Sequence, residues 1–162
     1  MLIPADKLGG HSRVWIYQAD RALNDQEVQR IESALSTFVS DWKAHGHPVQ
    51  GSAQVLHNHF LLIYADEEAS GVSGCSIDGS VRLIQDLGRE MQIDFFNRLN
   101  LVVQDADAVR VIPRMKLEAE IEAGQVTAET LVFDNLVATK ADLEASWQKP
   151  LRDTWAASAL PA

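Results

Sequence analysis

Cysteine, basic residues and long apolar runs are all scarce in this chain of 162 residues. The single cysteine, Cys75, excludes an internal disulfide and suits a reducing compartment. Fourteen lysines and arginines stand against 23 acidic residues, so we expect neither nucleic acid nor an anionic membrane as a partner. No apolar stretch reaches eighteen residues, and residues 1–10 lack the apolar run of a signal peptide. These absences predict a cytoplasmic protein without a membrane segment.

The remaining composition is typical of one ordinary globular domain. Hydrophobic residues make up 46% of the chain, and 162 residues are enough to bury a sizeable core. The sequence holds no internal repeat and no low-complexity segment. We therefore expect a single domain over residues 1–162, with residues 1–12 and 156–162 as ends that fray.

The first half of the sequence predicts alternating strands and helices. A β-prone run precedes a helix that Asn24 caps, with Glu27 completing a capping box. In chain order we expect a strand over residues 13–19, a helix that ends at Gly46 and Pro48, one long strand over 52–66 or two with a kink at 57–59, and a helix after Asp78. The inward stripes of the two helices are Val28, Ile31, Leu35, Phe38 and Trp42, then Val81, Ile84, Leu87 and Met91.

The second half predicts a hairpin, a further strand and two helices. In chain order these are a hairpin of residues 99–104 and 108–112, a helix over 114–123 that Gly124 stops, a strand over 130–137, and a helix that Thr139 caps and Pro150 ends. We expect Trp155 to anchor the tail that follows. The whole order predicts an α+β fold, with a mainly antiparallel sheet and helices packed on one face.

The stretch 70–81 combines a loop of small residues, the only cysteine and the start of a helix. Glycines allow a ligand to approach the backbone closely, and a helix N-terminus favours an anion such as phosphate or carboxylate. The residues that we expect to bind such a ligand are Ser73, Gly74, Cys75, Ser76, Asp78, Gly79 and Ser80. The alternative is a tight loop in which Ser76 or Asp78 caps the helix.

Cys75 is also a candidate nucleophile, because a thiol at a helix N-terminus has a lowered pKa when it is partly exposed. His45, His57 or His59 would then serve as its base. The simpler interpretation is a buried structural cysteine, and the nearby Asp78 opposes a thiolate.

Two histidines, His57 and His59, would share one face of an extended segment, with His45, His47, and Asp66 or Asp78 as further ligands of a metal. A His-x-His pair alone is a weak signal, and histidines in strands more often contact carboxylates or solvent. We therefore expect no metal and no cofactor.

Several of these segments resemble a family of short uncharacterised bacterial proteins, some of which carry the label ABC transporter ATPase. The resemblance rests on residues 42–48, Phe60, Asp66 and the block 73–81, and extends from Val14 to Trp155. It implies no particular reaction. A P-loop requires a glycine-rich turn that ends in Lys-Ser or Lys-Thr, and the sequence has no such pattern, so an ATPase activity is not expected.

Two hypotheses about function follow from the sequence. The first is a non-catalytic cytoplasmic domain that binds a protein or a small anionic ligand around residues 70–81. The second is a small thiol-dependent transferase or hydrolase with Cys75 as its nucleophile. The exposure of Cys75, and a histidine within hydrogen-bond reach of it, would distinguish the two.

Overall fold

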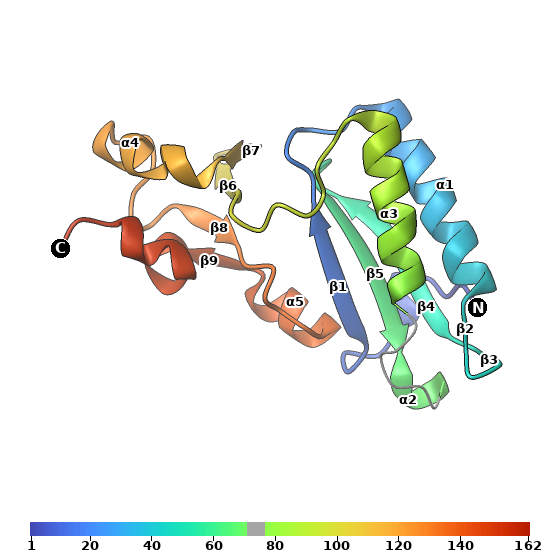
Figure 1. The fold of residues 1–162 in the computed structure, drawn as a ribbon. Coiled ribbons are helices and arrows are strands. Elements are labelled where there is room, and N and C mark those ends of the chain that lie inside the picture. The colour runs from blue at the N-terminus through green and yellow to red at the C-terminus, as the bar shows by residue number, and fades with distance from the viewer. Residues whose placement is uncertain (71–76) are drawn as a thin grey trace.

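The computed structural model describes residues 1–70 and 77–162, with only the backbone of Ser70. A three-stranded antiparallel sheet, called the first sheet, has the strand order β1 (Arg13–Gln18), β5 (Phe60–Asp66), β4 (Gln50–Leu56) (Figure 1). A four-stranded antiparallel sheet, called the second sheet, has the order β7 (Ala108–Ile112), β6 (Leu101–Asp105), β8 (Leu131–Phe133), β9 (Gln148–Pro150). A small separate hairpin consists of β2 (Lys43–Ala44) and β3 (His47–Pro48).

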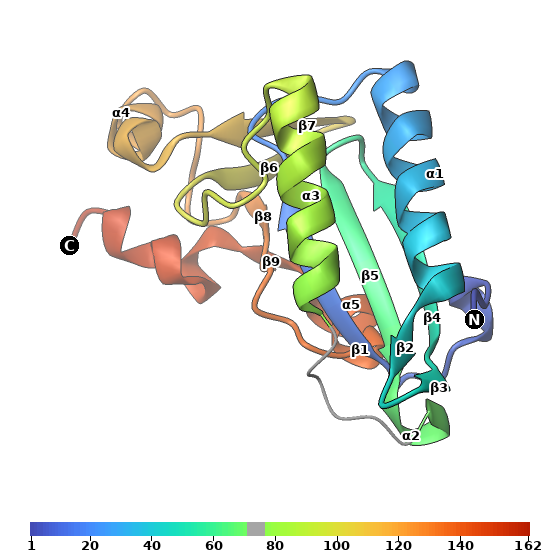
Figure 2. The same ribbon diagram turned by 45° about the vertical axis from the view of Figure 1, so that its right-hand side comes forward.

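Two long helices cover one face of the first sheet (Figure 2). They are α1 (Asp25–Asp41) and α3 (Asp78–Met91). The other face of the first sheet packs against the second sheet. The shorter helices are α2 (Glu67–Ser70), α4 (Leu117–Glu122) and α5 (Lys140–Ser146), with 3₁₀ turns at Ala5–Lys7, Arg114–Lys116, Leu151–Asp153 and Trp155–Ala159. The predicted α+β fold, mainly antiparallel with helices on one face of a sheet, is confirmed.

Strand β5 shows why the first sheet is buried on both faces. Its side chains alternate, and Leu61 and Ile63 contact the helices while Phe60 and Leu62 contact the second sheet. All four are fully buried. Each such side chain contributes roughly 1.5–3 kcal/mol through the hydrophobic effect. The continuous apolar run of residues 60–65 therefore fits a strand between two packed layers.

The predicted caps of two helices are present. Asn24 Oδ1 accepts a hydrogen bond from Glu27 N (2.8 Å), and Glu27 Oε1 accepts one from Asn24 N (3.0 Å), which completes the capping box of α1. Thr139 Oγ1 accepts from Asp142 N (3.1 Å) at the start of α5. These local side-chain contacts fix both helix starts.

One predicted boundary in the first half is wrong, and one open alternative is decided. Helix α1 ends at Asp41, not near Gly46, because the chain turns back into the small hairpin through His45 (φ 52°) and Gly46 (φ 80°). Residues 50–66 form two paired strands, which is the second of the two predicted alternatives, with the break at residues 57–59. Their tight turn places His57 (φ 55°) and Asn58 (φ 53°) in the left-handed region, as in the two-residue turns that join hairpin strands.

Other predictions fail where packing decides the outcome. Trp155 does not anchor the tail, since it is 44% exposed, and the fully buried side chains there are Leu151 and Ala156. Helix α5 ends at Ser146 because residues 148–150 join the second sheet as β9. In α3 the buried stripe includes Ser80, whereas Val81 is only partly buried. Among the described residues, no helix is long and apolar enough to cross a membrane.

Candidate functional site

The predicted ligand-binding residues of the 70–81 stretch are only partly described. Ser73, Gly74, Cys75 and Ser76 lie outside the described residues, so their predicted roles stay predictions. Asp78 and Gly79 are exposed in the first turn of α3. Ser80 is buried, and its hydroxyl donates to Ile77 O (2.6 Å). The buried hydroxyl in the described part of this stretch therefore bonds within the protein, to the start of the helix and to Tyr17.

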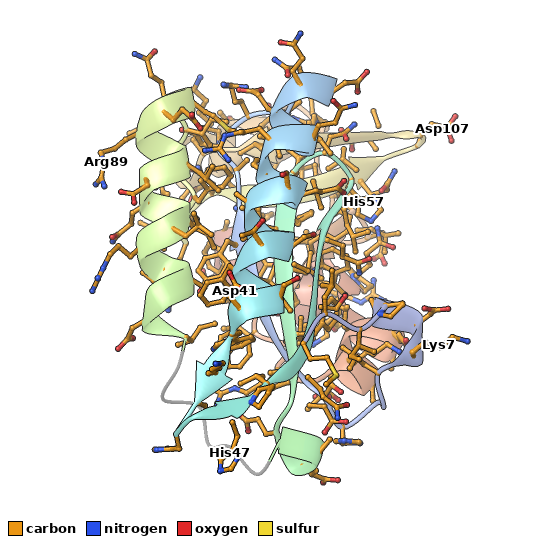
Figure 3. All side chains as sticks on the ribbon, turned by 90° about the vertical axis from the view of Figure 1, so that its right-hand side faces the viewer. Lys7, Asp41, His47, His57, Arg89 and Asp107 are labelled. Carbon is orange, nitrogen blue, oxygen red and sulfur yellow. The ribbon has the colours of Figure 1, made fainter. Side chains whose placement is uncertain are left out.

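The histidines proposed as bases lie at two ends of the first sheet. His57 and His59 lie where β5 begins, whereas α2 and the start of α3 lie where β5 ends (Figure 1). Figure 3 shows His57 at one end of the sheet and His47, from the hairpin that also holds His45, at the other end. The described structure thus separates His57 and His59 from the residues that flank segment 71–76, and it places His45 at the end where those residues lie.

His57 and His59 do not form the expected two-imidazole face, because they occupy a turn and not an extended strand. His59 is buried, and its Nδ1 lies 2.7 Å from the backbone oxygen of His57. The ring of His57 lies 5.0 Å from that of Phe133 and 5.6 Å from that of Trp147, between centroids. Burial, followed by the charge of His59, lowers the pKa of His57. No group of three or more potential metal ligands occurs among the described residues.

A cavity of about 360 Å³ lies beside β1, the strand of the first sheet that faces the loops of the second sheet (Figure 1). Its walls come from three segments that are distant in the sequence, and Trp155 closes one side. The volume falls in the range of small-ligand sites, roughly 300–1,000 Å³. The wall segments are β1, residues 95–98 with Asn100 and Leu101, and residues 132–138.

The open edge of β1 forms one wall of this cavity. Ala19 N donates to His59 O (2.7 Å), so the odd-numbered residues of the β1 segment bond to β5 and the even-numbered ones point outward. Val14 N donates to Ala138 O (2.9 Å), which covers one end of the edge. Within the described chain, no hydrogen bond reaches the outward N–H and C=O groups of Ile16 and Gln18. Unpaired backbone groups of a partly buried strand favour a ligand that supplies the missing partners.

Two side-chain amides, a backbone carbonyl and an indole form a chain of hydrogen bonds beside the cavity. Gln18 Nε2 donates to Asn100 O (2.8 Å), and Gln18 Oε1 accepts from Asn135 Nδ2 (3.0 Å). Asn135 Oδ1 in turn accepts from Trp147 Nε1 (3.0 Å). This chain of hydrogen bonds joins β1 to both loops that line the cavity, at Asn100 and at Asn135.

The charged residues that line the cavity are Arg13, Arg98 and Asp134. The negative charge of Asp134 is balanced by an ion pair, because its Oδ2 lies 2.7 Å from Lys149 Nζ. Arg98 makes no ion pair with any described residue. Burial raises the pKa of the neighbouring Tyr17, and a hydrogen bond with Ser80 and the charge of Arg98 oppose that shift. An uncompensated cation therefore lies in the cavity wall of a protein with a net charge of −9.

Exposed apolar side chains gather at the rim of the cavity. Phe96 is 39% exposed, Leu136 79% and Trp155 44%, and all three line the cavity. Phe96 also packs edge-on against Tyr17, with 5.6 Å between the ring centroids. Apolar side chains grouped in this way around a concave site are typical of a binding surface.

A second cavity, of about 460 Å³, lies between β4 and α5, and most of its polar side chains are already paired. Gln54 Nε2 donates to Tyr64 Oη (2.5 Å), and Lys140 Nζ donates to Leu8 O (2.8 Å). Lys140 also lies 3.5 Å from Glu144 Oε1. The cavity beside β1 is therefore the stronger candidate site.

The polar residues of the cavity beside β1 were not predicted from the sequence. Gln18, Arg98 and Asn135 are single polar residues in three separate stretches, and the hydrogen bonds of Gln18 span 82 and 117 positions. One usable signal was Gln18, a polar residue at the end of an apolar strand.

Comparison of the chain with protein-family models, with curated proteins and with solved structures finds no match. The resemblance noted from the sequence therefore remains an expectation, and the function has to be inferred from the site itself.

Proposed function

We propose that this chain is a non-catalytic cytoplasmic binding domain whose ligand lies in the cavity beside β1. The observation that carries the proposal is the free edge at Ile16 and Gln18, which opens into a concave site with an apolar rim. A ligand that pairs with this edge would satisfy backbone groups that each cost about 1–3 kcal/mol when buried without a partner.

The chemistry of the wall supports binding more than catalysis. Among the described residues that line the cavity, the polar side chains are mainly amides and arginines, and Asp134 is the one carboxylate. Asp134 is already paired with Lys149. Nucleophilic catalysis needs a nucleophile beside a base, and the cavity lining does not supply that pair. A role for Cys75 as a nucleophile remains the alternative hypothesis, to be tested by its rate of alkylation.

The test is a titration of the ¹⁵N-labelled protein with a fragment library, followed by heteronuclear NMR. We expect the fragments that bind to shift the amide signals of Ile16 and Gln18 and the indole signal of Trp155. The variant Trp155→Ala should weaken binding at least fivefold. Met115→Ala is the control, because Met115 is 85% exposed and does not line the cavity. If no fragment shifts the β1 signals, the proposal is wrong.

A further inference from the structure

We propose, on the basis of the binding function above, that the ligand is the C-terminal end of a peptide. Its last residues pair with the free edge of β1, and its terminal carboxylate lies against Arg98. Three features of the cavity support this assignment: the backbone groups that are free, the length of edge that is open, and the charge at the wall.

The free groups of β1 match a peptide backbone. Ile16 presents one donor and one acceptor, and Gln18 presents the same pair, on one edge. An added strand contributes a carbonyl for each N–H and an N–H for each carbonyl. Such backbone pairing supplies affinity that does not depend on the side chains of the bound peptide. The regular spacing of the four groups fits a strand better than a compact small molecule.

The open edge is short and covered at both ends. Ala138 accepts from Val14 N at one end, and Asn100 accepts from Gln18 Nε2 at the other. The stretch from Ile16 to Gln18 spans about 7 Å, since a strand rises about 3.3 Å per residue. Two or three ligand residues fit this length. A longer strand would have to pass both Ala138 and Asn100. A peptide that ends within the cavity has to pass only one of them.

The charge of the wall selects a carboxylate. Arg98 has no ion-pair partner in the described chain, while Asp134 is neutralised by Lys149. A guanidinium binds a carboxylate through two parallel hydrogen bonds, in an arrangement that a terminal carboxylate can adopt. Phe96, Leu136 and Trp155 at the rim would contact an apolar side chain of the same peptide.

The experiment uses the full chain and two hexapeptide libraries that are random at the last four positions. One library carries free C-terminal carboxylates, and the other carries the same sequences as C-terminal amides. Binding is located by NMR, and the tightest peptide is then resynthesised in both forms for calorimetry. We expect the free acid to bind at least tenfold more tightly than its amide, which corresponds to about 1.4 kcal/mol.

Matched arginine variants test the role assigned to Arg98. Arg98→Gln should lower the affinity of the free acid to that of the amide, and Arg98→Lys should restore part of the difference. Arg82→Gln is the control, because Arg82 is an exposed arginine of α3 that does not line the cavity. Thermal unfolding of each variant checks that the fold is intact.

The outcomes separate this inference from the binding function on which it rests. If acid and amide bind the β1 edge equally, or if amidated peptides bind through an acidic side chain, the assigned carboxylate is wrong while the binding function stands. If fragments shift the β1 signals but neither library does, the peptide is the wrong ligand class. If neither fragments nor peptides shift those signals, both proposals are overturned.

Discussion

Two tryptophans of equal burial differ in what their indole N–H groups contact. Trp147 is 7% exposed and Trp42 is 6% exposed. Trp147 Nε1 donates to Asn135 Oδ1, which continues the hydrogen-bonded chain to Gln18 at the base of the cavity. Trp42 Nε1 is buried and makes no hydrogen bond with any described residue. Comparison of the two tryptophans therefore isolates the contribution of one partly buried hydrogen bond.

We expect Trp147→Phe to lower the free energy of unfolding by about 1–3 kcal/mol more than Trp42→Phe does. Both changes remove similar apolar area, but only the first leaves the partly buried amide oxygen of Asn135 without its donor. Urea denaturation of both variants measures the difference. Equal losses of stability would mean that the hydrogen bond from Trp147 contributes nothing measurable.

At the scale of elements, several turns place a residue other than glycine in the left-handed region. Ala106, between β6 and β7, has a φ of 50°. Alanine pays roughly 1–2 kcal/mol for this conformation, whereas glycine adopts it freely. The alanine is exposed, so its methyl group contributes little packing to offset that cost.

We expect Ala106→Gly to stabilise the protein by about 0.5–1 kcal/mol, because relief of the left-handed alanine outweighs the added freedom of the unfolded chain. Ala119→Gly, at an exposed position of helix α4, should destabilise it by about 1 kcal/mol. Thermal unfolding of the two variants would give shifts of opposite sign. A loss of stability in both would contradict the assigned turn conformation.

The elements that the sequence predicted well are those fixed by neighbouring residues. The capping box of Asn24 and Glu27, the cap of Thr139 and the hairpin turn near Ala106 each depend on residues within a few positions. Such contacts are visible in the sequence because they require particular residue types at fixed spacing. Their success does not extend to the site, whose walls come from distant segments.

At the scale of the whole molecule, apolar runs predict that buried layers form, but they do not predict which layer packs against which. The runs in β1 and β5 bury both faces of the first sheet, one under helices and one under the second sheet. Neither run specifies which layer will cover it, because Val, Ile, Leu and Phe pack against either. The division into two sheets, and the cavity where their loops meet β1, depend on that choice. The sequence therefore predicted the fold class and missed the candidate site.

His57 lies at an exposed position where the two sheets meet. Its ring packs against Phe60 of the first sheet, against Phe133 of the second sheet, and against Trp147, which directly precedes β9. Burial lowers the pKa of His57 below its ordinary value of 6.5, with a smaller effect from the charge of His59. The unfolded chain therefore takes up the proton at a higher pH than the folded chain does. It follows that the contribution of His57 to stability is complete above pH 6.5 and declines as the pH falls through its folded pKa.

We expect the stability advantage of the wild type over His57→Asn to shrink as the pH is lowered from 8 to 5.5. Asparagine suits the left-handed turn, so the comparison isolates the ring and its proton. A hydrogen bond with Asp66 raises the pKa of His11, so the contribution of His11 to stability changes with pH in the opposite direction. That contribution cancels in the comparison, because both proteins retain His11. His47→Asn, at an exposed position of the small hairpin, is the control and should show no such trend. Urea denaturation at four pH values measures the advantage, and a constant difference would mean that the ring of His57 is not desolvated between the sheets.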